Sequence, residues 1–463
     1  MKIDLGKNEL IHFVGIGGIG MSGLALIMNG LGYKVQGSDI ADNRNIERLN
    51  KKKIKIFLNH KKENIKKTTV LVISSAIKKN NPELVEAIKK NLPVYTRGDM
   101  LGHIVSFMRN VVITGSHGKT TTTSLVSSIF TAGKLDPTII NGGVLNSFGN
   151  SAKLGKSNWC VTESDESDGS FLKIPFTYSI ATNLDSEHLD FYKNINNLKK
   201  SFHKFIDKIP SVGKGFLCND DLNLKNVFKK STNKNFYTYG KSKNSNFQII
   251  NIKQTTNYSN FDIKINIPSK KKIIKGIKLP MIGIHNIQNA TAAASLAFTI
   301  GLPERYIKQG LYNFKGVQRR FSHLFNHNNI SFYDDYAHHP TEISSVLSGV
   351  KNVYKNKEIV CVFQPHRISR VINLKKEFSK CFKKADTVLL CPIYTANEKL
   401  RLNFTYHSFA KLIIKNSNVK LIQVDNESQL RSFIRQNTFG KKIYIGMGAG
   451  SISNWMKNLE NIF

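Results

Sequence analysis

A glycine-rich turn followed by lysine and threonine holds the residue types that bind a polyphosphate. It follows the apolar run Val111–Ile113, precedes a helical segment, and consists of Gly115, Ser116, His117, Gly118, Lys119, Thr120 and Thr121. Backbone N–H groups of such a turn can face phosphate oxygens, the lysine adds a positive charge, and the first threonine can coordinate a metal ion. The usual loop begins with a glycine where this chain has Ile113, so the spacing is shortened. We expect ATP or GTP here; a turn without a ligand is the alternative.

Carboxylates and a histidine follow two further apolar runs. The acidic stretch Glu163–Asp168 comes directly after Trp159–Val161. His188 lies in the segment Thr182–Leu189, which follows Tyr178–Ile180. Carboxylates at a strand end beside a phosphate loop suit a hard cation such as Mg²⁺. A histidine near them could hold a second ion, and two ions could bridge a phosphoryl group and an acceptor oxygen. A solvated acidic loop and an ordinary surface histidine stay open as alternatives.

A second glycine-rich turn lies near the start of the chain. It follows the strand-like run Ile11–Val14, and its glycines are Gly15, Gly17, Gly18 and Gly20. Asp39 stands after the next strand-like run, Lys34–Gln36. This is the pattern of a dinucleotide-binding turn, in which a pyrophosphate lies at a helix N-terminus and the acid binds a ribose hydroxyl. NAD, FAD and a nucleotide-sugar all satisfy it, and a purely structural turn is the alternative.

Polar side chains also follow strand-like runs in the last third of the chain. His338 follows Ile330–Tyr333, and Arg367 and Arg370 follow Ile359–Phe363. Because open α/β sheets bind ligands at the carboxyl ends of their strands, we expect these side chains to share one sheet edge. Two arginines one helical turn apart suit carboxylate or phosphate recognition. Surface salt bridges are the alternative for either arginine.

Strand-like runs alternate with helical segments along the whole chain, which predicts α/β domains with mainly parallel sheets. We expect three domains, at residues 1–108, 109–315 and 316–463. The polar, lysine-rich segment 233–278 alternates weakly and is interpreted as an antiparallel excursion of the second domain. Asn289, at the start of an alanine-rich helix, could contact a base edge or simply cap the helix.

The composition excludes several classes of protein. With 68 basic and 32 acidic residues the net charge is +36, which would suit nucleic-acid binding. The lysines, however, are dispersed without interleaved aromatic residues, so we favour a lysine-rich surface and expect no nucleic-acid partner. Five scattered cysteines fit a reducing compartment. No apolar run approaches the roughly 18 residues that cross a membrane, so we expect a cytoplasmic protein without a membrane partner.

The order of these motifs resembles that of the Mur ligases over nearly the whole chain, from about residue 10 to residue 450. The resemblance rests on the two glycine turns, the acidic stretch, Gly316–Phe321, and the segments around His188, Asn289, His338 and Arg367. The first glycine turn and the His338-His339 pair narrow it to the alanine-adding branch. It implies a Rossmann-like first domain for a UDP-sugar, a central P-loop ATPase-like domain for ATP and Mg²⁺, and a Rossmann-like third domain for the amino acid.

The resemblance also implies a reaction. An ATP-dependent ligase would transfer the γ-phosphoryl group to the lactyl carboxylate of UDP-N-acetylmuramate, and the amine of L-alanine would then displace phosphate from the acyl phosphate. A recycling ligase that attaches a preformed peptide to the same nucleotide-sugar is the nearest alternative. A pyridine-nucleotide dehydrogenase built on the first glycine turn is a remote one, because it leaves Lys119, Glu163 and His188 without a role.

By the same resemblance, individual residues take roles. The loop Gly115–Thr121 would bind ATP together with Asn289 and Arg319. Thr120 and Glu163 would hold the metal between the β- and γ-phosphates, and His188 a second metal. The substrates would be bound by Gly15, Gly17, Gly18, Gly20, Asp39, His338, Arg367 and Arg370, and the catalytic set would be Lys119, Glu163, His188 and His338. We expect Lys119→Ala to abolish turnover and to leave the fold intact.

Overall fold

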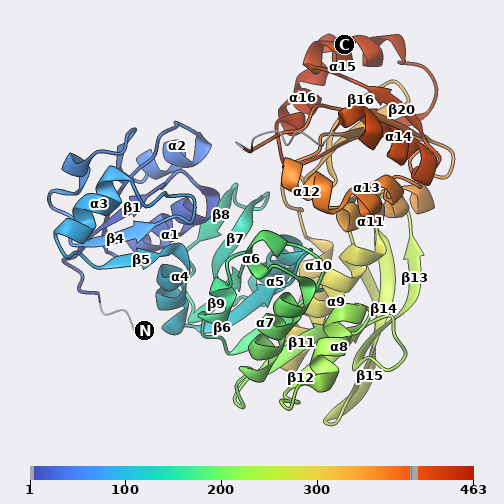
Figure 1. Cartoon of the computed structure of the whole chain (residues 1–463). Helices are drawn as coiled ribbons and strands as arrows, with labels where there is room; N and C mark the ends of the chain where they lie inside the picture. The colour runs from blue at the N-terminus through green and yellow to red at the C-terminus, as the bar shows by residue number, and fades with distance from the viewer. Residues whose placement is uncertain (1–4, 397, 399–404) are drawn as a thin grey trace. The chain divides into compact units, whose positions relative to one another are not determined.

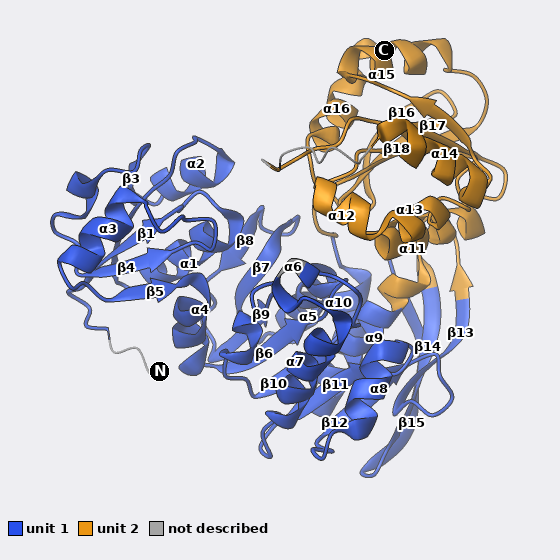
Figure 2. Cartoon of the chain, viewed as in Figure 1, with its two compact units in different colours: residues 1–252, 260–279, 288–315 blue, residues 253–259, 280–287, 316–463 orange. Residues whose placement is uncertain are grey.

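The computed structural model describes residues 5–396, 398 and 405–463 (Figure 1). In this part of the chain the strands form three sheets, of five, ten and six strands. The predicted fold class, α/β with three domains and mainly parallel sheets, is confirmed. Two compact units divide the chain (Figure 2): residues 1–252, 260–279 and 288–315 form the first, and residues 253–259, 280–287 and 316–463 the second. The domain boundaries given above stay a prediction, because the first two sheets belong to one unit.

The first sheet is wholly parallel, with the strand order β3-β2-β1-β4-β5. Its strands are β1 (Leu10–Val14), β2 (Lys34–Ser38), β3 (Lys55–Phe57), β4 (Val70–Ile73) and β5 (Val94–Thr96). Its helices are α1 (Ile19–Gly30), α2 (Arg44–Asn50), α3 (Pro82–Lys89) and α4 (Arg97–Ser106). The order reverses at β1, so the glycine turn that follows β1 lies at the switch point where such sheets bind ligands.

A buried polar network fills the space beside β1 and β2. Glu83, which has no exposed surface, accepts hydrogen bonds from the Ser38 hydroxyl at 2.6 Å and the Asn64 amide at 2.7 Å. His60 Nδ1 lies 2.9 Å from the same carboxylate, and His12 Nε2 lies 3.4 Å from it. Burial would raise the pKa of Glu83, but hydrogen bonds with His12, Ser38 and Asn64 outweigh it, so the pKa lies below its ordinary value. The network ties α3 to the end of β2.

The second sheet has the order β15-β14-β13-β12-β11-β10-β6-β9-β7-β8. Its strands are β6 (Arg109–Thr114), β7 (Thr138–Leu145), β8 (Asn150–Lys153), β9 (Trp159–Glu163), β10 (Tyr178–Ala181), β11 (Lys214–Cys218), β12 (Phe236–Gly240), β13 (Phe247–Gln254), β14 (Ser259–Ile267) and β15 (Lys270–Leu279). Its helices are α5 (Lys119–Ala132), α6 (Leu189–Tyr192), α7 (Ile195–Asp207), α8 (Leu222–Lys230), α9 (Ile284–Thr299) and α10 (Glu304–Tyr312). The central strand β6 has a continuous buried apolar run, Val111–Ile113, as a strand covered on both faces requires.

The antiparallel excursion predicted from residue 233 was wrong at its start. Strand β12 pairs parallel with β11, and β13 pairs parallel with β12. Helix α8 connects β11 to β12, and such a crossover returns the chain in the same direction. The period-two alternation of Phe261, Ile263, Ile265 and Ile267 does reflect a half-buried strand, because all four side chains are buried in β14.

The third sheet lies in the second unit, with the order β16-β17-β21-β18-β19-β20. Its strands are β16 (Ser322–His327), β17 (Ile330–Asp335), β18 (Glu358–Phe363), β19 (Thr387–Leu390), β20 (Lys420–Gln423) and β21 (Lys442–Met447). Its helices are α11 (Pro340–Val353), α12 (Ile368–Asn373), α13 (Lys375–Lys380), α14 (Tyr406–Ser417), α15 (Glu427–Gln436) and α16 (Ile452–Asn458). Among the described strands of this sheet, only β16 pairs antiparallel with its neighbour. Separate buried apolar clusters cover the two faces of the sheet.

All five cysteines are buried and free. Among the described residues, no helix combines the length and the apolar composition needed to cross a membrane.

We predict that Glu83→Gln weakens the first sheet in a pH-dependent way. Because the pKa of folded Glu83 lies below the ordinary 4.5, its contribution to stability is complete above that pH and is lost as the pH falls toward the folded pKa. The variant should therefore lower the local free energy of unfolding by about 1–3 kcal/mol at neutral pH, and by less near about pH 3.5. Hydrogen exchange of the β1 and α3 amides measures this at both pH values.

The matched control is Glu86→Gln on the same helix. Glu86 forms a surface pair with Lys90 at 3.4 Å, so its loss should change stability by less than about 1 kcal/mol. Equal effects of the two substitutions, or a Glu83→Gln effect that grows on acidification, would contradict the role given to the buried carboxylate.

Candidate active site

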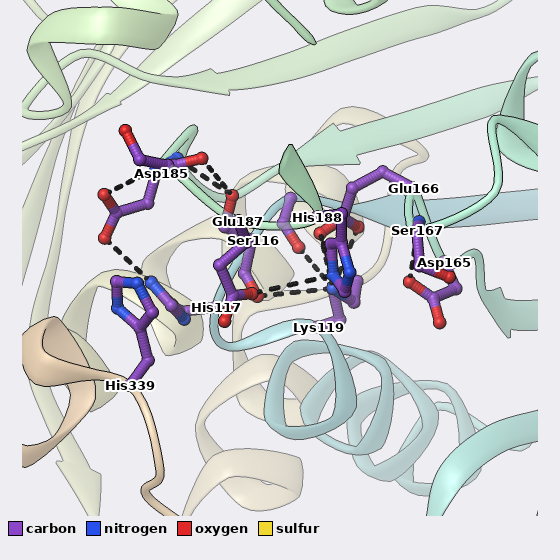
Figure 3. A network of polar contacts seen from close by, with 12 residues as sticks. Ser116, His117, Lys119, Asp165, Glu166, Ser167, Asp185, Glu187, His188 and His339 are labelled. Atoms are coloured by element: carbon purple, nitrogen blue, oxygen red, sulfur yellow. Dashed lines mark hydrogen bonds and ion pairs between the residues drawn. The ribbon is translucent and has the colours of Figure 1, made fainter. Parts of the chain in front are cut away.

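The second sheet brings together three of the segments singled out in the sequence. Strand β6 lies between β9 and β10, and both neighbours run parallel to it. The phosphate loop follows β6, the acidic stretch follows β9, and the His188 segment follows β10. Since parallel strands end at a common edge, their loops meet there (Figure 3).

The phosphate loop has a conformation that requires its two glycines. Gly115 and Gly118 have φ values of 128° and 81°. A Cβ on Gly115 would lie 2.2 Å from Thr182 Oγ1, and one on Gly118 would lie 2.7 Å from Asn289 Oδ1. The contact with Thr182 leaves no room for a side chain at position 115, and the positive φ at both positions favours glycine. Asn289 therefore lies directly against the loop, as its predicted contact with ATP requires.

The loop is also held from the side by the segment that follows β10. The Ser116 N–H donates to the Asn183 carbonyl at 3.1 Å, and the His117 N–H donates to Asn183 Oδ1 at 2.8 Å. The Asp185 N–H donates to the Ser116 hydroxyl at 2.8 Å, and His117 Nε2 lies 3.0 Å from Asp185 Oδ2. Helix α5 begins at Lys119 without a side-chain cap or an acidic residue in its first turn, so its N-terminus suits an anion.

Lys119 forms a buried ion pair with Glu166. Its Nζ lies 2.9 Å and 3.1 Å from the two Glu166 carboxylate oxygens and donates to the Gly115 carbonyl at 2.7 Å. Glu166 has no exposed surface. Burial would lower the pKa of Lys119, but the charges of Glu166, Asp165 and Glu163 outweigh it and raise the pKa, so the ammonium stays charged.

His188 joins the same group from the other side. Its Nε2 lies 3.7 Å from Glu166 Oε1 and 3.8 Å from Glu187 Oε2. The ligand atoms of Asp165, Glu166 and His188 all lie within 4.8 Å of one another. Burial would raise the pKa of Asp165, but the charges of Lys119 and His188 outweigh it, so the pKa is lowered and this carboxylate is ionised at neutral pH. Two carboxylates and an imidazole form a donor set that fits a divalent cation.

Thr120 and Glu163 are predicted to hold the other metal ion. Thr120 belongs to the phosphate loop, and Glu163 ends β9, the strand that pairs with β6. Thr120 is the second residue of α5 and is buried. The Glu163 carboxylate lies against Gly142, where an added Cβ would be 2.1 Å from Oε1. Its Oε2 is buried and has no hydrogen-bond partner, which fits an oxygen that awaits a cation. Their shared role as metal ligands stays a prediction.

A cavity of about 330 Å³ joins this acidic group to the first glycine turn. Gly18 and Gly20 line one side, and Glu163, Asp165 and Asp168 line the other. Helix α1 begins after Gly18 without a side-chain cap, so one end of the cavity offers free N–H groups and the other end carboxylates. An anionic group is favoured at the first end and a cation at the second.

The turn itself is stabilised by Asp39. The Asp39 carboxylate accepts the Gly17 N–H at 2.8 Å through Oδ2 and the Ile40 N–H at 2.8 Å through Oδ1. Asp39 therefore positions the glycine turn through these two hydrogen bonds. Its contact with a ribose hydroxyl stays a prediction.

Sequence reasoning missed three residues of this site. Arg97 lines the cavity, and a Cβ on Gly20 would lie 3.5 Å from its Nη1. Asn141 lines it as well, and its buried Oδ1 has no hydrogen-bond partner. Glu166 was quoted within the acidic stretch but received no role. Arg97 follows β5 and so carried the same strand-end signal as the other motifs, whereas Asn141 lies inside β7, where the sequence offers no signal.

The residues predicted in the second unit form a group of their own. His338 Nδ1 lies 2.9 Å from the Tyr336 carbonyl and 3.5 Å from Glu342 Oε2. The rings of His338 and His366 have centroids 6.0 Å apart, and Arg370 Nη1 lies 3.3 Å from His366 Nδ1. Burial, followed by the charge of Arg370, lowers the pKa of His366 to about 4, so this imidazole is neutral at pH 7.

The other two arginines predicted to belong to the site, Arg367 and Arg319, both have a positive φ. Arg367 precedes α12 with a φ of 68°. Arg319 has a φ of 60°, donates to the Gly448 carbonyl, and lies with its guanidinium 4.8 Å from the centre of the Tyr336 ring. The predicted contacts of Arg319 with the nucleotide, and of His338, Arg367 and Arg370 with the substrates, stay predictions.

Three family models match the chain in consecutive order. The Mur ligase family catalytic domain matches residues 10–109, the Mur ligase middle domain residues 113–297, and the Mur ligase glutamate ligase domain residues 319–436. The chain belongs to the Mur ligase family. As a Mur ligase it is an ATP-dependent ligase, and the dehydrogenase alternative is excluded.

Individual relatives agree with this family. A UDP-N-acetylmuramate–L-alanine ligase of Pelagibacter ubique is 62% identical over 463 residues, which is 100% of both chains. The enzyme of that name from Brucella ovis is 44% identical over 86% of this chain and 85% of its own. The crystal structure of a UDP-N-acetylmuramate-alanine ligase from Thermotoga maritima, 27% identical, superposes with a TM-score of 0.79 and covers 97% of this chain and 98% of its own.

A murein peptide ligase from Psychrobacter arcticus shares the fold of this Mur ligase. It superposes with a TM-score of 0.70 at 21% identity, over 98% of both chains.

The Lys119–Glu166 pair alters one expectation drawn from the sequence. Removal of the lysine leaves a buried carboxylate without its counter-charge, so Lys119→Met should lower the free energy of unfolding by about 3–5 kcal/mol. Lys119→Met/Glu166→Gln should recover most of that loss, because neither charge is then buried alone. Denaturant unfolding of the two variants in EDTA measures the difference.

The exposed pair of Lys153 with Asp136, at 2.6 Å, is the matched control. Lys153→Met should cost less than about 1 kcal/mol. A Lys119→Met variant as stable as the wild type, or a double variant less stable than Lys119→Met, would show that the buried pair does not stabilise the loop.

Proposed function

We propose that this Mur ligase joins L-alanine to the lactyl carboxylate of UDP-N-acetylmuramate at the expense of ATP, a step in peptidoglycan precursor synthesis. The observation that carries the proposal is the cavity that connects the first glycine turn to the phosphate loop's acidic group within one unit. Its lining offers helix N-terminal N–H groups, which would bind a nucleotide-sugar pyrophosphate, and the carboxylates that follow β9, the strand next to the one that leads into the phosphate loop. The relative from Pelagibacter ubique, 62% identical over its whole length, carries the same assignment.

A carboxylate is a poor electrophile, so amide formation needs activation. In the proposed sequence, the lactyl carboxylate oxygen attacks the γ-phosphorus of ATP, ADP leaves, and an acyl phosphate forms. The neutral amine of L-alanine attacks the acyl carbon, and the tetrahedral intermediate collapses with loss of phosphate and of the amine proton. The chain acts mainly by positioning and by electrostatic stabilisation.

The residues divide this work between them. The N–H groups at the start of α5 and the ammonium of Lys119 would hold the transferring phosphates. Thr120 and Glu163, and separately Asp165, Glu166 and His188, would hold Mg²⁺, which would neutralise charge on the phosphoryl oxygens. In the second unit, Arg367 and Arg370 suit the substrate carboxylate and His338 the amine. A cytoplasmic location and the three substrate-binding domains belong to the same proposal.

The neighbour from Psychrobacter arcticus keeps one alternative in view, a ligase that attaches a preformed peptide. One assay decides between the two: phosphate release from ATP with UDP-N-acetylmuramate and, in separate reactions, L-alanine, glycine, L-serine or a tripeptide. We expect turnover with L-alanine, no turnover without the nucleotide-sugar, and little with the tripeptide. Turnover with the tripeptide alone would refute the alanine assignment and favour the recycling reaction.

Arg97 gives a second test of the cavity. Its guanidinium lies beside Gly20, where the pyrophosphate or the lactyl carboxylate would lie, and a charge-assisted hydrogen bond of this kind contributes about 1.5–3 kcal/mol. Arg97→Met should therefore raise the KM for UDP-N-acetylmuramate by about tenfold or more, while the KM for ATP stays within about twofold. Steady-state kinetics with each substrate varied in turn measure both.

Lys173→Met is the control for Arg97. Lys173 lies on the surface and pairs with Asp99 at 3.5 Å, so its loss should leave both KM values unchanged. Equal changes in the two KM values of Arg97→Met would argue against a contact with the nucleotide-sugar.

A further inference from the structure

The ammonium of Lys119 has no donor left for a phosphate. Its three N–H groups meet the Gly115 carbonyl at 2.7 Å, both oxygens of Glu166 at 2.9 and 3.1 Å, and the Ser116 carbonyl at 3.3 Å. A lysine of a phosphate loop acts by contacting the β- and γ-phosphates. It can do so here only if one of these oxygen atoms is released.

Glu166 is the partner whose release has consequences. Its backbone carbonyl accepts the Tyr192 hydroxyl at 2.5 Å and the Gly169 N–H at 3.1 Å, so its main chain is fixed and only the carboxylate can turn. The carboxylate has no exposed surface. Once Lys119 turns to a phosphate, a buried negative charge remains beside the incoming negative charges of the nucleotide, and it needs another cation.

The neighbouring donors can supply a place for that cation. Asp165 and His188 have ligand atoms within 4.8 Å of Glu166. Asn141 points independently to a ligand here: it is 4% exposed, its Oδ1 has no hydrogen-bond partner, and it lines the same cavity as Asp165. An oxygen acceptor left without a donor in a buried wall is a feature of a site that takes a cation or a hydrogen-bond donor.

We propose that the Lys119–Glu166 pair couples nucleotide binding to cation binding. The phosphates take Lys119, and the carboxylate released by this exchange joins Asp165 and His188 as a ligand of Mg²⁺. Without a nucleotide, Lys119 itself is the counter-ion of Glu166 and keeps the divalent cation out. Because the coupling is a free energy shared by two sites, each ligand must strengthen the binding of the other by the same factor. Glu166 is thus a metal ligand only when the nucleotide is bound, and the inference rests on the proposed binding of ATP at the Gly115–Thr121 loop.

Nucleotide affinity tests one side of the coupling. A non-hydrolysable ATP analogue is titrated by calorimetry into the wild type, Glu166→Gln and Glu304→Gln, once in EDTA and once in Mg²⁺. In Glu166→Gln the gain in affinity from Mg²⁺ should fall by about tenfold or more, mainly through tighter binding in EDTA. Glu304, a partly exposed carboxylate of α10 that pairs with Lys308 at 2.7 Å, is the matched control, and its variant should keep the wild-type gain.

Cation affinity tests the other side. Mn²⁺ binding without nucleotide, followed by electron paramagnetic resonance, should be about tenfold or more tighter in Lys119→Met than in the wild type. Lys119→Met/Glu166→Gln should lose this gain, because the freed carboxylate is then absent. If Glu166→Gln does not fold, the Mn²⁺ affinity of Lys119→Met tests the coupling by itself.

The results separate this inference from the proposed function. An unchanged Mg²⁺ effect in folded Glu166→Gln, or unchanged Mn²⁺ binding in folded Lys119→Met, overturns the coupling and leaves the ligase assignment standing. A wild type that binds no nucleotide in either buffer overturns the ATP loop, and the coupling with it.

Discussion

The position of one strand determines whether this active site can exist. Strand β6 lies between β9 and β10 in a parallel register, so the segments that follow these three strands end at the same edge of the sheet. Tens of residues of chain separate the phosphate loop, the acidic stretch and the His188 segment from one another. The order of the strands brings all three to the same edge of the sheet. The central run of β6, Val111–Ile113, is apolar and buried, as expected for a strand covered on both faces of the sheet.

The charges gathered at that edge would repel one another without a cation. Four carboxylates of the stretch Glu163–Asp168 lie beside a loop built to receive the phosphates of ATP, and at short range like charges cost several kcal/mol in a protein interior. Lys119 and His188 offset part of this charge in the protein alone. In the proposed complex, the nucleotide would bring further negative charge and engage the lysine. The divalent cations proposed above would offset this charge. The +36 net charge of the whole chain does not replace them, because most of the described lysines are exposed and their charges are screened.

Much of this arrangement could be predicted from the sequence, because it depends on the residues that come directly after each strand. The phosphate loop, His188 and the first glycine turn were found in this way, and the fold class was confirmed. The choice among neighbouring carboxylates could not be made: Glu163 ends β9 and lies against Gly142, whereas Glu166 turns back to Lys119, and no periodicity governs an irregular loop. Arg97 and Asn141 belong to other parts of the unit and meet the site only through packing. The parallel pairing of β12 was missed because the segment 233–278 is polar and lysine-rich and alternates only weakly, a composition that does not reveal the direction of a strand.

The shortened phosphate loop depends on tertiary contacts for support that a loop of the usual spacing obtains from its own backbone. A loop of the usual spacing can surround its ligand with its own backbone. Here Ile113 stands where that loop has its first glycine, and the glycine turn begins only at Gly115. Thr182, Asn183 and Asp185 supply the missing support by hydrogen bonds to both the backbone and the side chains of the loop. The close approach of Thr182 leaves room only for glycine at position 115, whereas position 118 is crowded by Asn289 of α9. The shortened spacing makes the motif harder to recognise in the sequence. In the structure, hydrogen bonds from the segment after β10 support the shortened loop. The two have to be considered together, because neither determines the shape of the phosphate site alone.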